Sequence, residues 1–146
     1  MNKNNEFSEH INQHGDGVRD IAFEVEDCHN VYKVVLSKGA IGIQEPTVVE
    51  DKKGAGKVIV ATVKTYGDTR HTFIQRDQFK GTFFPNFDVC KPDPINTLLG
   101  EVSFNFIDHI VANHQDIEQT VEWYQKVLGF HKYWSIDDTL LHTEYS

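Results

Sequence analysis

The 146-residue sequence predicts an α+β fold of repeated strand–helix–strand–strand–strand (βαβββ) modules, one complete and a second incomplete. Two observations lead to this prediction. Residues 20–23 (DIAF) match residues 108–111 (DHIV) at an offset of 88 positions. Each of these segments is followed by an amphipathic segment of helical period that ends at a glycine, Gly39 or Gly129. A period this long indicates a duplicated module, not a solenoid of short repeats.

The complete module is expected at residues 18–76, after the tail of a preceding module at residues 1–17. Its first strand spans residues 18–25, because apolar and polar side chains alternate there with the period of two typical of strands. A helix follows, for which Asp27 is a suitable N-cap and the Lys38-Gly39 pair a suitable C-terminal signal.

Four further strand segments are expected after this helix. A short strand at residues 40–43 and a weak one at residues 47–50 precede the strongest strand prediction, residues 57–66. That segment (KVIVATVKTY) is rich in β-branched side chains, which favour strands. A turn at Gly67-Asp68 then returns the chain as a strand over residues 69–75.

Residues 77–100 lose both periodicities and contain three of the four prolines, so we interpret them as a linker. Four phenylalanines within nine residues are expected to pack this linker onto the body of the protein: Phe79, Phe83, Phe84 and Phe87. The same four aromatic side chains also fit a ligand groove, and packing is the favoured interpretation.

The second module is expected to begin at residue 101 and to be truncated within residues 101–146. Its first strand is predicted at residues 102–111, and Asp116 is a suitable N-cap for the helix that follows. One face of that helix collects its apolar side chains: Ile117, Val121, Tyr124, Val127 and Leu128. Strands at residues 130–136 and 139–145 then form a predicted hairpin.

His109 is the position where the two repeats differ most in chemistry, because the offset of 88 pairs it with Ile21. On the predicted strand, His109 shares a face with Ile107 and Val111, so its side chain is expected to point inward. A histidine in that setting is either a core residue hydrogen-bonded to a carbonyl or water, or a metal ligand. Spacing alone favours the core residue.

A rival set of candidate ligands combines His109 with His142 and Glu144, which share one face of the last predicted strand. Two histidines and one carboxylate are the ligands of many non-haem iron sites. An exposed polar face of a hairpin explains His142 and Glu144 equally well, and we favour that interpretation.

Composition and charge exclude several classes of protein. A formal net charge of -8 argues against a protein that binds the phosphate backbone of nucleic acids. No apolar run approaches the ~18 residues of a membrane span, and the first fifteen residues lack the apolar stretch of a secretory signal. Two cysteines 62 residues apart form no disulfide framework, so we expect a reducing compartment and a cytoplasmic location.

Several segments resemble the 4-hydroxyphenylpyruvate dioxygenase family, and its animal members most, in the same order and at close to the same spacing. They are HGDGVRDIAFEVED (14–27), TYGDTRHT (65–72), IDHIV (107–111), EWY (122–124), WSIDDT (134–139) and HTEYS (142–146). The resemblance extends over about residues 6–146 and identifies the chain as similar to an internal fragment of these enzymes.

The resemblance implies the vicinal-oxygen-chelate superfamily, with four βαβββ modules in the full enzyme, of which the last two form the catalytic domain. It implies Fe(II) held by two histidines and one glutamate, and a homodimer. The implied reaction converts 4-hydroxyphenylpyruvate and O2 to homogentisate and CO2, a step of tyrosine and phenylalanine breakdown.

Carried over residue by residue, the resemblance makes His109 the first iron ligand, whereas the HTEYS strand of the family binds no iron. The second histidine, the glutamate and the substrate-contacting residues are expected beyond Ser146, so this chain is expected to be inactive by itself. Two alternatives stay open: an oxygenase similar to 4-hydroxymandelate synthase, and a non-enzymatic module that pairs with another chain through an open sheet edge.

Overall fold

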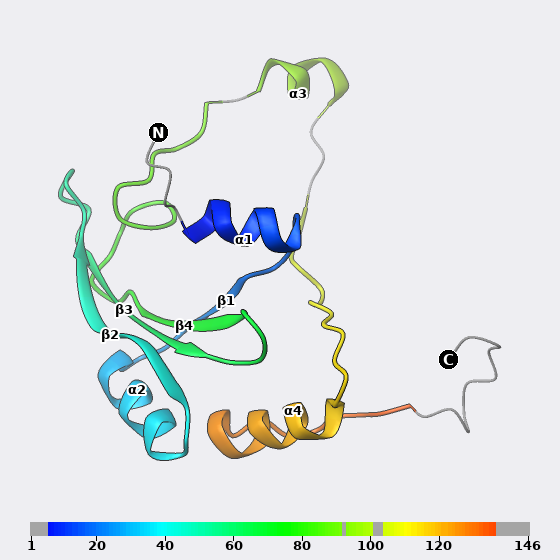
Figure 1. The fold of residues 1–146 in the computed structure, drawn as a ribbon. Coiled ribbons are helices and arrows are strands. Elements are labelled where there is room, and N and C mark those ends of the chain that lie inside the picture. The colour runs from blue at the N-terminus through cyan, green and yellow to red at the C-terminus, as the bar shows by residue number, and fades with distance from the viewer. Residues whose placement is uncertain (1–5, 92, 101–103, 137–146) are drawn as a thin grey trace.

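A four-stranded mixed sheet forms the centre of the protein in the computed structural model, which describes residues 6–91, 93–100 and 104–136 (Figure 1). The strands are β1 (Asp20–Glu24), β2 (Ile41–Glu50), β3 (Lys57–Lys64) and β4 (Arg70–Gln75). Their order across the sheet is β1-β4-β3-β2, with β1 parallel to β4 and the other neighbours antiparallel. With helix α2 between β1 and β2, the βαβββ order predicted for the first repeat is confirmed.

Helix α2 (Cys28–Ser37) begins and ends at the predicted signals. The carboxylate of Asp27 accepts a hydrogen bond from the backbone N–H of Asn30 at 2.9 Å, which satisfies one of the unpaired donors of the first turn. Gly39 follows the helix with a φ of +104°, a backbone conformation that glycine adopts most readily.

Strand β2 joins the two short strands predicted at residues 40–43 and 47–50 into one irregular strand. Its pairing with β3 shifts register between Gly42 and Gln44 and again between Gln44 and Thr47. The irregular stretch contains Pro46, which has no N–H to give to the ladder. The interruption seen in the sequence is therefore an irregularity within a strand, not a break between strands.

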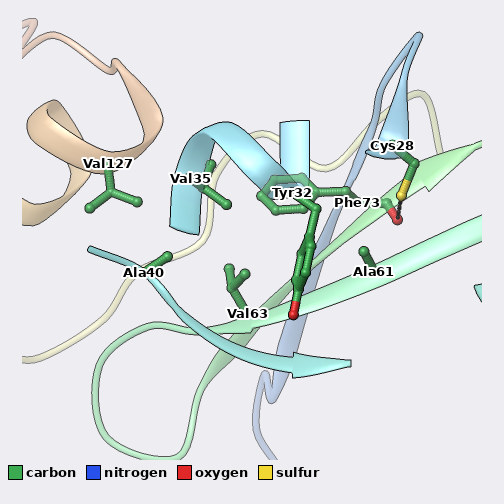
Figure 2. Close-up of a cluster of buried hydrophobic side chains, with 8 residues drawn as sticks. All are labelled: Cys28, Tyr32, Val35, Ala40, Ala61, Val63, Phe73 and Val127. Carbon is green, nitrogen blue, oxygen red and sulfur yellow. Dashed lines mark hydrogen bonds between the residues drawn. The ribbon is translucent and has the colours of Figure 1, made fainter. Parts of the chain in front are cut away.

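The main core lies between α2 and the sheet (Figure 2). Its buried members are Cys28, Tyr32, Val35, Ala40, Ala61, Val63, Phe73 and Val127. Val127 belongs to the second repeat, so the two repeats share one core.

A smaller core covers the opposite face of the sheet, where Val58 and Val60 pack with Phe79 from the segment after β4. Phe84 is half-buried against this cluster, whereas Phe83 and Phe87 are exposed. The predicted packing of the four phenylalanines is thus confirmed for two of them and wrong for the other two.

Two more helices belong to segments predicted as a tail and a linker. Helix α1 (Glu6–His14) lies on the side of the sheet opposite α2, and Pro94–Leu99 forms the short helix α3 (Figure 1). In the part of the chain that the structure describes, no helix is long and apolar enough to cross a bilayer.

The second repeat forms its predicted helix as α4 (Ile117–Trp123), continued by a π-helical turn η1 (Tyr124–Leu128). Asp116 caps it by accepting from the backbone N–H of Gln119 at 3.0 Å, and Gly129 ends it in a left-handed conformation with φ +73°.

The strands predicted at residues 102–111 and 130–136 are wrong for the described residues, which are irregular at 104–111 and 130–136. The strand predicted at residues 139–145 lies outside the described residues. In the first repeat, β1 is an edge strand whose neighbour in the sheet is β4. In the second repeat, the strand equivalent to β4 would come after the hairpin predicted at residues 130–145. Because a strand exists only when it is paired, residues 104–111 have no described strand on which to form one.

Candidate functional site

His109, the predicted metal ligand, lies on the irregular segment that precedes α4, and 71% of its side chain is exposed. Ile107 and Val111 are exposed as well. The prediction that His109 points inward between these two residues is therefore wrong in this structure. The cause is the missing strand, because inward placement depends on alternation in a paired sheet.

The imidazole of His109 nevertheless has a partner suited to a metal ligand. Its Nδ1 lies 2.5 Å from Oδ2 of the neighbouring Asp108. An ionised carboxylate only accepts hydrogen bonds, so Nδ1 is the donor, and in the neutral imidazole the lone pair is then on Nε2. Metal-binding histidines commonly have such a carboxylate on the nitrogen that does not bind the metal. The side chains fit the role of a single ligand, and that role remains a prediction.

The rest of a three-residue metal site is not found among the described residues, where no three histidine, cysteine, aspartate or glutamate side chains are grouped to hold a metal ion. The rival ligands His142 and Glu144 lie outside the described residues.

The two helix N-caps change the correspondence between the repeats by one residue. Asp27 and Asp116 hold equivalent capping positions 89 residues apart, whereas the sequence match assumes an offset of 88. On the cap-based correspondence, His109 is the counterpart of Asp20 and not of Ile21. A shift of one residue reverses the face of a strand, so the two correspondences predict opposite faces for His109 in a paired strand.

Asp20 lies on the face of the sheet opposite α2, within a polar row. Its Oδ2 accepts a hydrogen bond from Oγ1 of Thr72 at 2.7 Å. The same Thr72 Oγ1 lies 3.0 Å from Oγ1 of Thr62. Odd-numbered side chains of β1 lie on the other face of the sheet, where Phe23 packs against the core beneath α2. The cap-based counterpart of His109 is therefore on the polar face.

His71 is a buried histidine that the sequence analysis missed. It is 1% exposed, and its Nδ1 donates to the carbonyl oxygen of Ile21 at 3.0 Å. Because that carbonyl only accepts, Nε2 carries the lone pair and accepts from the hydroxyl of Tyr124 at 2.8 Å. Alternation within the predicted strand 69–75 places His71 beside Phe73, a signal that identifies it as a core side chain.

The surroundings of this pair shift both of its titratable groups toward the neutral form. Burial lowers the pKa of His71, although the Ile21 carbonyl and the charge of Asp20 oppose the change. Burial, with the neighbouring Tyr66 phenol, raises the pKa of Tyr124 to about 12. The pair is thus a neutral hydrogen bond that joins β4 to the second-repeat helix.

Neither cysteine forms a disulfide. The Cys28 thiol is buried with its Sγ 3.5 Å from the carbonyl oxygen of Phe73, and burial raises the pKa of Cys28 to about 11. A thiol in this state is a poor nucleophile, so Cys28 is a core residue.

Comparison with known proteins identifies relatives over the whole chain. The Glyoxalase family model (Glyoxalase/Bleomycin resistance protein/Dioxygenase superfamily) matches residues 106–145. The chain is 47% identical to the 4-hydroxyphenylpyruvate dioxygenase of Danio rerio, over 98% of this chain and 36% of that protein. It is 46% identical to that of Tetrahymena thermophila (97% and 35%) and 44% identical to that of Dictyostelium discoideum (98% and 40%). The chain therefore spans little more than a third of the length of these relatives.

The fold also matches a solved structure, a triple mutant of 4-hydroxymandelate synthase from Streptomyces coelicolor. The TM-score is 0.66 at 23% identity, over 93% of this chain and 38% of that one. At this identity the match is evidence of a common fold and of nothing finer.

Proposed function

We propose that this chain, a homologue of the 4-hydroxyphenylpyruvate dioxygenases, is part of an iron-dependent dioxygenase that converts 4-hydroxyphenylpyruvate and O2 to homogentisate and CO2. The observation that carries the proposal is the identity of 40–47% to dioxygenases of this name over 97–98% of the chain. Identity to 4-hydroxymandelate synthase is 23%, so the similarity favours the dioxygenase over the synthase.

In this proposal His109 supplies one of three protein ligands to Fe(II), through Nε2. Asp108 keeps the proton on Nδ1 and so holds the imidazole in the tautomer that binds a metal. Bound Fe(II) would supply the redox chemistry that O2 requires. The remaining ligands are proposed to lie beyond Ser146, as the family resemblance implies.

We further propose that residues 18–76 belong to the non-catalytic half and residues 101–146 begin the catalytic half. Residues 1–17 are then the tail of a preceding module and residues 77–100 the connection between the halves. Large apolar side chains are exposed in the described part of the second repeat, as expected for a sheet whose partner strands lie elsewhere: Phe104, Phe106, Ile107, Val111, Tyr133 and Trp134. A cytoplasmic location, a homodimer of the complete enzyme and a role in tyrosine and phenylalanine breakdown belong to the same proposal.

The same exposed apolar side chains favour one alternative, a non-enzymatic module that pairs with another chain. Light scattering coupled to size-exclusion chromatography on the 146-residue chain distinguishes this alternative from the dioxygenase proposal. The pairing alternative expects a stable dimer of this chain alone, whereas the dioxygenase proposal assigns these side chains to contacts within a longer enzyme.

A chimera tests the proposed activity directly. These 146 residues replace the aligned segment of the Danio rerio dioxygenase, which is 47% identical to them. We expect homogentisate to form from 4-hydroxyphenylpyruvate with stoichiometric O2 uptake, and the activity to be lost on His109→Ala. Replacing the exposed His131 with alanine is the matched control and should leave the activity in place. A folded, inactive chimera, or a His109→Ala chimera with full activity, would overturn the proposal.

A further inference from the structure

A pocket of about 570 Å³ lies between α1 and the polar face of the sheet. Apolar side chains line part of it: Phe7, Ile11, Val60 and Phe84. Two arginines, Arg19 and Arg70, line another part, beside Glu6 of α1. The volume is typical of pockets that hold small organic molecules, and the mixture of apolar wall and charged groups is typical of their lining.

The two arginines converge on one carboxylate. Nη2 of Arg19 donates to Oε2 of Glu6 at 2.6 Å, and Nη1 of Arg70 donates to the same oxygen at 3.4 Å. Nε of Arg70 is buried and has no hydrogen-bond partner among the described residues. Two guanidinium groups offer ten N–H donors, so one shared oxygen leaves most of their capacity for a carboxylate unused.

Glu6 is a replaceable occupant of this position. Its side chain is 70% exposed, and α1 buries none of its residues. Hydrogen bonding to Arg19 and the charge of Arg70 lower the pKa of Glu6, which shows that the position stabilises an anionic carboxylate. A ligand carboxylate in the same place would leave the net charge around the arginines unchanged, with Asp20 still accepting from Thr72.

We infer that this pocket binds a small carboxylic acid with an apolar body, whose carboxylate replaces that of Glu6 between Arg19 and Arg70. The apolar body lies against the hydrophobic part of the lining, and α1 shifts to release Glu6. The inference does not depend on the proposed dioxygenase activity, because all of its residues lie in α1, the first repeat and the segment that packs on it.

The probe is 3-phenylpropionate, titrated to about 10 mM into the ¹⁵N-labelled chain, with binding followed by amide shifts of Gly17, Thr62 and Thr72. We expect saturable shifts at these amides and none with 3-phenylpropanamide, which has the same body without the charge. Glu6→Gln removes the competing carboxylate and should tighten binding about threefold or more. Arg70→Met should weaken binding about tenfold, whereas Arg76→Met, a control arginine outside the pocket lining, should not.

Circular dichroism first establishes that each variant is folded. If Arg70→Met does not fold, the affinity of Glu6→Gln for 3-phenylpropionate tests the inference. The inference is overturned if 3-phenylpropionate leaves the pocket amides unshifted, if the amide probe binds equally well, or if Glu6→Gln fails to tighten binding.

Discussion

Replacing Tyr124 with phenylalanine removes the hydrogen bond that joins the two repeats. The hydroxyl lies 2.8 Å from Nε2 of His71, and phenylalanine keeps the ring that stacks on Phe130. The variant therefore removes one donor and leaves the packing in place. A buried acceptor that loses its partner costs about 1–3 kcal/mol. We expect Tyr124→Phe to lower the free energy of unfolding by about 1–2 kcal/mol.

Urea unfolding at pH 7.5, followed by far-UV circular dichroism, measures this change. The control is Tyr133→Phe, since the side chain of Tyr133 is 94% exposed and its replacement should change the free energy by less than about 0.5 kcal/mol. Equal stability of Tyr124→Phe and the unaltered protein would refute the anchoring role of this hydrogen bond, as would an equal loss in both variants.

Three further predictions follow from the same structure. Because burial lowers the pKa of His71 below the unfolded value of about 6.5, its contribution to stability is complete above pH 6.5 and declines as the pH falls toward the folded pKa. The urea concentration at the unfolding midpoint should fall between pH 8 and pH 5, and the fall should be smaller in His71→Gln. Gly56→Ala should cost about 1–3 kcal/mol more than Gly54→Ala, since both have positive φ but only the Gly56 Cβ would meet a backbone oxygen, at 1.9 Å; equal thermal melts would contradict this. The 146-residue chain alone should form no homogentisate in an oxygen-electrode assay with 4-hydroxyphenylpyruvate, Fe(II) and ascorbate, and product would restore His142 and Glu144 as candidate ligands.

Features that depend on neighbouring residues could be predicted from the sequence. Asp27 and Asp116 cap helices because a carboxylate reaches an N–H three residues on, whatever the rest of the chain does. Strand β3 is correctly predicted for a similar reason, since its β-branched residues favour a strand and its two sheet neighbours, β2 and β4, come directly before and after it along the chain.

Features that depend on distant partners could not be predicted in the same way. The strand proposed around His109 requires a partner that the periodicity of residues 102–111 cannot supply, and the inward orientation of His109 was wrong for that reason. Alternation with Phe73 marks His71 as a core side chain, but its hydrogen-bond partner Tyr124 is 53 residues away and has no local signal. The π-helical turn that carries Tyr124 has no sequence signal that we recognise.

The iron content of the purified chimera tests the central claim, that His109 is a ligand in an iron dioxygenase. Metal analysis of the folded proteins, compared by circular dichroism, is independent of turnover. We predict about one iron per chain for the chimera and for its His131→Ala control, and loss of iron on His109→Ala. Equal iron in His109→Ala and the control would contradict the account.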